Sequence, residues 1–310
     1  MKWEKKGLVC SCETFSLDWY KKNTMVPVPY LIDSKTLRIF LTMCDKDNIG
    51  RIGYVDVKPD NPSEIIEYSK LPILDIGIDG AFDDNGVVTA SVFEEDEKIY
   101  MFYSGYQLGK KVPYFIFAGL AVSNDKGNTF DRVSKAPLLA RNDSEIMTRC
   151  VPEVIKEGDK YRMFYAGDYE TGWVEKGGKK RPCYSFKYLY SNDLEKWPNE
   201  EGKECIALAE DGDEHGIAKA SVWEEDNKYK MLYSIRSLSK GYRLGYAESE
   251  NKVDFLRMDD KVGIDVSEHG FDNEMICFPS RFQYKDRVYL FYCGNHYGMA
   301  GFGYAELIEK

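Results

Sequence analysis

Acidic residues recur at one spacing along this 310-residue chain, and carboxyl groups are the side chains of acid–base chemistry. Each stands seven residues before an alanine or a proline: Asp83 before Ala90, Glu145 before Pro152, Asp213 before Ala220 and Asp272 before Pro279. Two carboxyl groups in different environments can act as a general acid and as a base or nucleophile. A repeated aspartate can equally stabilise a turn, because its side chain hydrogen-bonds nearby backbone amides. Both interpretations stay open for these positions.

Polar residues that do not recur are stronger candidates for a site, because a fold needs the same turn several times whereas a site needs different groups once. On this argument we expect Asp84 to be one catalytic carboxylate, with Glu274 or Glu170 as its partner. The candidate ligand-binding residues are Asp83, Asn85, Arg149, Asp168, His215, Lys219, Arg236 and His296. Of these, Arg149, His215, Lys219 and Arg236 would form an anion pocket. Tyr106, Tyr169, Trp173 and Tyr297 would add aromatic surfaces.

A repeated pair of strands must bring these residues together. The second strand of each pair reads LRIFLT, IYMFYSG, YRMFYAG, YKMLYSI or VYLFYCG, and each follows an apolar strand and a short charged turn. Four copies keep one register, and the first copy is one residue out of step at Pro29. Five units of roughly 50 to 65 residues, with three or four strands each, predict an all-β five-bladed β-propeller. We expect it to form a single domain over residues 1–310. A β-sandwich is the alternative, but it gives no reason for one register to hold four times.

The propeller predicts where strands and site lie. First strands are expected at about 26–32, 87–93, 150–156, 217–223 and 277–283, around one channel. Residues that enter a first strand and leave the antiparallel second strand share a face, which places the candidate residues at one channel mouth. The segment GLVCSC should pair with the last unit, since an unpaired edge invites association. The insertion DYETGWVEKGGKKRPCYSF is expected to be a loop over one face.

Composition excludes several classes of partner. The net charge is −10 and the basic residues are scattered, which argues against nucleic acid or a membrane surface as the partner. The eight cysteines lack the close double pairs of a zinc site, and the three histidines share no short spacing. We therefore expect no metal and no cofactor. Without a signal-peptide core, the chain is expected to be cytoplasmic, with reduced thiols; its oligomeric state is open.

On these motifs the sequence resembles the five-bladed propellers of the arabinanase, invertase, levansucrase and mannoside-phosphorylase superfamily. The resemblance spans nearly the whole chain, and the segments AVSNDKGNTF and LYSNDLEKW are similar to the A-x-S-x-D and Trp turns of those enzymes. It implies a glycoside hydrolase-like enzyme that cleaves or transfers a glycosyl group at the channel mouth, using two carboxyl groups.

The sequence departs from the superfamily at its usual catalytic positions. An Asp is expected immediately before the small residue or proline, but Thr89, Val151, Lys219 and Phe278 stand there, and Cys150 replaces the usual Glu of the third unit. Either catalysis has moved to the acidic groups upstream, or hydrolysis has been lost. The first alternative function is therefore a non-catalytic propeller that binds a glycan or a sugar precursor. The second is a phosphorylase or transferase that uses an anionic sugar donor.

The carboxylate assignment is testable by substitution. If Asp84 is a general base or nucleophile, Asp84→Asn should abolish most turnover and leave folding and affinity largely intact, because the side chain keeps its shape and loses its charge. Turnover of a substrate found by screening glycosides and nucleotide sugars, compared with that of Asp83→Asn, measures this. An undiminished rate in the Asp84 variant would refute the assignment.

Overall fold

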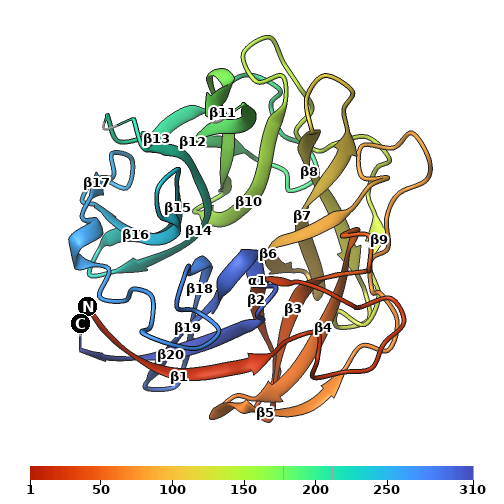
Figure 1. The fold of residues 1–310 in the computed structure, drawn as a ribbon, viewed down its shortest axis with the longest axis vertical. Coiled ribbons are helices and arrows are strands. Elements are labelled where there is room, and N and C mark those ends of the chain that lie inside the picture. Colours follow the sequence, from red (N-terminus) through yellow and green to blue (C-terminus); the bar gives the residue numbers. More distant parts are fainter. Residues whose placement is uncertain (177, 211, 310) are drawn as a thin grey trace.

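The computed structural model describes residues 1–176, 178–210 and 212–309, and excludes the side chains of residues 170, 171, 176 and 179. Its elements are almost all β-strands (Figure 1). The strands are β1 (Lys2–Cys10), β2 (Thr24–Asp33), β3 (Thr36–Cys44), β4 (Gly50–Lys58), β5 (Asn61–Tyr68), β6 (Val87–Glu95), β7 (Lys98–Leu108), β8 (Tyr114–Ser123), β9 (Asp131–Arg132), β10 (Thr148–Glu157), β11 (Lys160–Lys176), β12 (Lys179–Ser191), β13 (Lys203–Ile206), β14 (Glu214–Glu225), β15 (Lys228–Ser237), β16 (Gly241–Ser249), β17 (Leu256–Arg257), β18 (Cys277–Tyr284), β19 (Arg287–Cys293) and β20 (Phe302–Glu309). The helical turns are η1 (Asp259–Lys261) and α1 (Asn295–Gly298).

The strands form five antiparallel groups in chain order. Group 1 is β2–β5, group 2 is β6–β9, group 3 is β10–β13, group 4 is β14–β17, and group 5 is β18–β20 with β1. Short parallel contacts, β8 with β10 and β12 with β14, join groups 2, 3 and 4 into one twelve-stranded sheet. All five expected first strands are present within β2, β6, β10, β14 and β18.

The five first strands lie around a common centre (Figure 1). They contact one another in the cyclic order β2, β6, β10, β14, β18 and back to β2. The last group is completed by the beginning of the chain, because β1 pairs antiparallel with β20 over most of its length. The predicted pairing of GLVCSC with the last unit is therefore confirmed for the residues Gly7 to Cys10.

A bulge interrupts every first strand near the centre. The pairing with the second strand shifts at each bulge, between Met25 and Val28, Thr89 and Ser91, Cys150 and Glu153, Ala218 and Ser221, and Cys277 and Ser280. At four bulges a residue other than glycine is left-handed: Val26 (φ 52°), Val151 (46°), Lys219 (41°) and Phe278 (58°). A positive φ is strained for bulky and β-branched side chains, so the surrounding structure must hold it.

Side chains of the neighbouring group hold these bulges. In four groups a side chain of the second strand accepts a hydrogen bond from a bulge N–H of the next group. The accepting residue directly follows Leu41, Tyr103, Tyr233 or Tyr292. The pairs are Thr42 Oγ1 with Thr89 N (2.9 Å), Ser104 Oγ with Val151 N (2.9 Å), Ser234 Oγ with Phe278 N (2.7 Å) and Cys293 Sγ with Val26 N (3.2 Å). Group 3 has Ala166 at this position and offers no such acceptor to Lys219. The contact from Cys293 to Val26 links the last group to the first.

Two expectations about the chain path were wrong. We expected Pro29 of group 1 to correspond to Ala90 of group 2. The bulge gives this position to Pro27 instead, because β2 contains an additional irregularity between Leu31 and Asp33. The segment expected as a loop over one face is instead a long hairpin, since β11 and β12 pair again from Trp173 and Pro182 onward after an irregularity that follows Asp168.

None of the eight cysteines forms a disulfide in the structure, and six of them are buried. Within the described residues, no helix combines the length and the apolar character needed to cross a bilayer.

The role of the bulge contacts can be measured on Ser104. Ser104→Ala should lower the free energy of unfolding by about 1–3 kcal/mol, because the buried N–H of Val151 loses its acceptor. Urea unfolding followed by far-UV circular dichroism measures the change, with the exposed Ser16→Ala as a control expected to shift stability by less than about 0.5 kcal/mol. A Ser104→Ala protein as stable as the control would contradict the role assigned to this contact.

Candidate ligand-binding site

A cavity of about 580 Å³ lies where the five first strands meet. Each of these strands contributes lining residues: Met25 and Val26 from β2, Val88 from β6, Cys150 and Val151 from β10, Ala218 from β14, and Phe278 from β18. Three of the left-handed bulge residues are among them, so the strained backbone forms the base of the cavity. Its volume is within the range of small-molecule sites in proteins.

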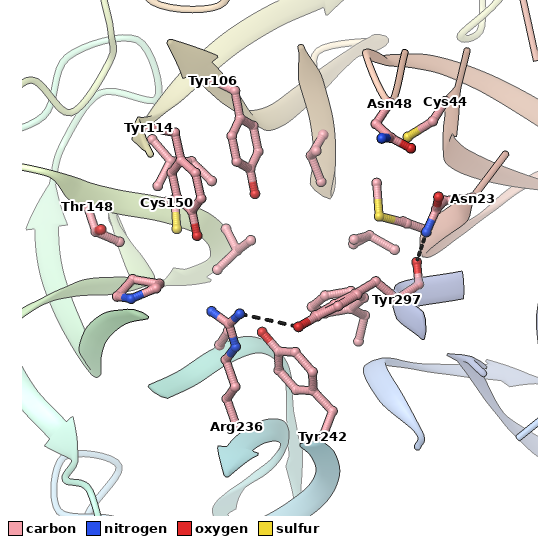
Figure 2. Close-up of a pocket in the computed structure, with 18 of the residues that line it drawn as sticks. Asn23, Cys44, Asn48, Tyr106, Tyr114, Thr148, Cys150, Arg236, Tyr242 and Tyr297 are labelled. Carbon is pink, nitrogen blue, oxygen red and sulfur yellow. Dashed lines mark hydrogen bonds between the residues drawn. The ribbon is translucent and has the colours of Figure 1, made fainter. Parts of the chain in front are cut away.

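Tyrosines form much of the wall (Figure 2). Tyr106 and Tyr114 of group 2 pack edge to face, with ring centroids 5.3 Å apart. The Tyr242 ring contacts Tyr297 edge to face at 5.6 Å, and its hydroxyl lies 3.1 Å from that of Tyr184. Rings with hydroxyls directed at a cavity combine apolar surface with hydrogen-bonding capacity, as a sugar requires.

The third strands of groups 2, 3 and 4 supply the lining residues Tyr114, Tyr184 and Tyr242, which were not predicted from the sequence. Chain order predicted a site built from the entrances of first strands and the exits of second strands, without the entrances of the third strands. Those entrances lie on the same face, because Tyr242 pairs directly with Arg236 at the end of the second strand. A signal was present, since Tyr184 and Tyr242 both stand seven residues before the serine that ends their strands, Ser191 and Ser249.

The segment between β19 and β20 forms one edge of the cavity and has an unusual backbone. His296 (φ 53°) and Tyr297 (φ 59°) are consecutive left-handed residues, and both line the cavity. The Asn23 amide holds them by donating to both of their carbonyl oxygens, at 2.9 and 3.1 Å. Asn295 anchors the segment from the other side, because its Oδ1 accepts from the N–H of Glu274 at 2.8 Å.

Arg236 is the one lysine or arginine among the described lining residues, and its guanidinium points into the cavity (Figure 2). It donates to the hydroxyls of Tyr184 at 3.5 Å and Tyr297 at 3.3 Å. Its charge also lies 5.7 Å from the ring centroid of Tyr242. Within the described part of the chain, no carboxylate lies within ion-pair distance of Arg236, so only neutral groups contact this charge.

Tyr106, Tyr114 and Tyr242 of the cavity keep their phenol protons at neutral pH. Burial raises the pKa of Tyr114 to about 12, although the Arg236 charge opposes this shift. Burial also raises the pKa of Tyr106 and of Tyr242 well above the usual value. The phenols therefore act as hydrogen-bond donors and acceptors and do not neutralise the guanidinium.

Three of the repeated acidic residues are buried within the groups and lie outside the cavity lining. Each accepts a hydrogen bond from the tyrosine of its second strand: Asp83 from Tyr103 (2.9 Å), Glu145 from Tyr165 (2.8 Å) and Asp272 from Tyr292 (3.0 Å). A cation compensates each charge: Arg132 at 2.7 Å from Asp83, Arg149 at 2.9 Å from Glu145, and Lys5 at 2.7 Å from Asp272. These carboxylates thus tie the strands of one group together.

Group 4 builds the same cluster from another residue. Its tyrosine, Tyr233, donates to Asp259 of η1, which also pairs with Arg257. The repeated residue Asp213 instead accepts from the backbone N–H and the hydroxyl of Ser239, at 2.9 and 2.7 Å. The repeated carboxylates therefore serve buried clusters in three groups and a turn in the fourth.

The structure brings two of the predicted site residues, Arg236 and His296, together at the cavity. Glu274 lies beside it, since its Oε2 is 3.3 Å from His296 Nε2, and both side chains are exposed. Asp84 precedes β6 and accepts from the N–H of Gly80 at 2.9 Å, outside the described lining. The side chain of Glu170 lies outside the described residues. The catalytic assignment of these carboxylates remains a prediction.

Other predicted residues lie outside the described cavity lining. Arg149 pairs with Glu145 and donates to the carbonyl oxygens of Ala140 and Glu200. Lys219 Nζ lies 3.1 Å from Glu153 Oε2.

The remaining predicted residues bond to backbone. The carboxylate of Asp168 accepts from Met147 N at 2.8 Å, and the backbone N–H of Asn85 donates to Tyr106 O at 3.0 Å. The buried ring of His215 donates from Nδ1 to the carbonyl of Pro182 at 2.8 Å, because a carbonyl oxygen can only accept.

Within the described residues, no group of three or more His, Cys, Asp or Glu side chains is arranged to hold a metal ion.

Comparison with solved structures defines the fold. A protein described as a glycoside hydrolase superposes with a TM-score of 0.74 at 19% identity, over 99% of this chain and 92% of that chain. A thermostable family-43 glycoside hydrolase gives 0.68 at 16% identity, over 93% and 91%. A Bombyx mori β-fructofuranosidase in complex with sucrose gives 0.61 at 17% identity, over 93% and 61%. The chain therefore has the fold of these glycoside hydrolases.

Sequence comparison gives a narrower family. The uncharacterised proteins MT1551 and Rv1502, from two strains of Mycobacterium tuberculosis, are each 30% identical to the chain over 308 residues. The match covers 99% of this chain and 99% of each relative. The chain belongs to the family of these mycobacterial proteins. No family model matches it.

Burial of His215 predicts a pH dependence of stability. Burial lowers its pKa from 6.5 to about 4, with the charges of Arg236 and Arg181 acting in the same direction. Between these values the unfolded chain binds a proton that the folded chain does not, so the free energy of unfolding should fall as the pH decreases from about 6.5 to about 4, by up to about 3 kcal/mol.

Urea unfolding at a series of pH values, for the parent and for His215→Gln, tests this. The variant should show a flatter profile in this window, whereas replacement of the exposed His269 should leave the profile as in the parent. Parallel profiles for the parent and His215→Gln would show that His215 does not contribute.

Proposed function

We propose that the protein is a carbohydrate-binding five-bladed propeller whose ligand occupies the central tyrosine-lined cavity. The supporting observation is the lining itself: it carries tyrosines from four of the five groups, and none of the lining residues that the structure describes is an aspartate or a glutamate. Aromatic surfaces with a few polar groups suit a sugar, which presents apolar C–H faces and hydroxyl edges.

The propeller is proposed from three features taken together. Five antiparallel groups follow one another along the chain, their first strands contact in a cycle, and β1 completes the last group. In this arrangement the groups are blades, the cavity lies on the axis, and residues 1–310 form one domain. The fold shared with glycoside hydrolases supports the same view.

The lining favours binding over hydrolysis by paired carboxylates. Glycoside hydrolysis ordinarily uses two carboxyl groups on either side of the scissile bond, about 5–10 Å apart. In the described structure, the repeated carboxylates Asp83, Glu145 and Asp272 are already committed to tyrosines and cations inside the groups. Sugar binding requires no such pair, and the aromatic cavity is sufficient for it.

A second candidate function is glycoside cleavage at the same cavity, as in the proteins that share the fold. The contact between His296 Nε2 and Glu274 Oε2 at the cavity edge favours it, because it places one carboxyl group and one imidazole near the ligand. Asp84, which precedes β6, remains the proposed partner of Glu274. Reducing-sugar release during the binding experiments below decides between the two candidates.

Tyr297 provides the test of binding at this cavity. Tyr297→Ala should weaken sugar binding at least about tenfold, because an aromatic wall is lost from the cavity. Isothermal titration calorimetry with a panel of neutral and acidic mono- and disaccharides measures affinity, and product analysis of the same mixtures measures cleavage.

The control is Tyr190→Ala, since Tyr190 is outside the cavity and almost equally exposed, 37% against 38% for Tyr297. Equal affinities for the two variants would place the sugar elsewhere. Release of product by the parent, and its loss in Glu274→Gln, would establish cleavage in place of binding alone.

A further inference from the structure

The cavity holds a positive charge that no described carboxylate compensates, and this determines which ligand fits. Other cations predicted for the site are matched by carboxylates: Arg149 by Glu145, and Lys219 by Glu153. Within the described residues, the hydrogen-bond partners of Arg236 are tyrosine hydroxyls, with those of Tyr184 and Tyr297 at 3.3 to 3.5 Å. These distances are longer than those of strong charge-assisted hydrogen bonds, which are about 2.7–2.9 Å.

Hydrogen-bond donors converge around Arg236. A guanidinium has five N–H donors in a planar fork and no acceptor, and two weak contacts leave most of that capacity unused. A tyrosine oxygen that accepts from the guanidinium directs its own proton elsewhere. The Tyr297 hydroxyl can therefore donate a hydrogen bond to a bound group. The Tyr184 hydroxyl can do the same when it accepts from the Tyr242 hydroxyl and does not donate to it.

Partial desolvation makes an opposite charge valuable at this position. Aromatic rings surround the guanidinium, with the centroids of Tyr242 and Tyr297 at 5.7 and 5.8 Å from its carbon. In such surroundings an ion pair is screened less than at an open surface, and an unpaired charge is costly. A ligand anion would supply both the missing charge and the acceptors.

We propose that the ligand is an anionic sugar whose carboxylate or phosphate group binds Arg236 between Tyr184 and Tyr297, while its ring lies against the tyrosine wall. This inference rests on the proposed sugar-binding function and narrows its ligand class. A carboxylate or a phosphate presents two oxygens that match the guanidinium fork, and a neutral sugar does not.

The test compares acidic sugars with the neutral sugars from which they derive. Glucuronic acid and galacturonic acid carry a carboxylate, glucose 1-phosphate and galactose 1-phosphate carry a phosphate, and glucose and galactose carry neither. Calorimetric titration of the parent at low salt should give at least about tenfold tighter binding of one acidic class than of the neutral sugars, with an affinity that falls as salt rises. The class that binds identifies the anionic group.

Variants at Arg236 separate charge from geometry. Arg236→Gln should reduce affinity for the acidic sugar at least about tenfold and abolish its preference over the neutral sugar. Arg236→Lys should retain part of the preference, because the charge remains and the planar fork is lost. Arg281→Gln is the control, since Arg281 lies outside the cavity and likewise makes none of the ion pairs seen among the described residues.

The outcomes distinguish this proposal from the proposed function. Neutral sugars that bind as tightly as acidic ones, or an Arg236→Gln protein with an unchanged preference, would overturn the anionic ligand and leave sugar binding standing. If no sugar of either kind binds the folded parent, both proposals fail. Thermal unfolding with inorganic phosphate against chloride at equal ionic strength gives a second readout, in which only proteins with Arg236 should be stabilised.

Discussion

The hydrogen bond from a bulge N–H to a side chain of the preceding group is the contact on which the centre of this molecule depends. A bulge breaks the regular pairing of a strand, so its N–H needs an acceptor from elsewhere. Ser104 supplies one to Val151, and Ser234 supplies one to Phe278. Four of the five groups are therefore completed by their neighbour, and the left-handed residues Val26, Val151 and Phe278 that line the cavity are held by two groups at once. The same contact from Cys293 to Val26 joins the end of the cycle to its beginning.

The distribution of charge follows from the same requirement that buried polar groups have partners. Acidic residues that could have served chemistry at the centre are instead engaged one layer outward, where Tyr103, Tyr165 and Tyr292 donate to them. Burying a carboxylate is costly unless a cation and further hydrogen bonds accompany it, and each cluster has both. The cavity is consequently aromatic, with Arg236 as its charged group among the described residues. A chain with net charge −10 thus carries a positive centre.

The sequence predicted the path of the strands better than the direction of the side chains. The repeated aromatic strands located all five first strands and the closing pair, because alternation and register depend on the backbone period alone. Arg236, His296 and the tyrosines 106 and 297 were placed on the correct face by chain order. Arg149 and Lys219 were placed there too, but they pair with Glu145 and Glu153. A bulge rotates side chains by an amount that no periodic pattern contains, and ion-pair partners come from residues far along the chain.

Pairing of β1 with β20 also governs how the chain reaches its final form. The residues joined by this ladder are at opposite ends of the sequence, as in the pair Lys2 and Glu309. During synthesis β1 leaves the ribosome long before its partner β20 exists, and groups 1 to 4 are made in the interval. Contacts between such distant segments are slow to form, since the entropy of closing the loop precedes any gain from the pairing. We therefore expect β1 to be among the last of the described strands to pair, and until then both edges of an open array would be available to other chains.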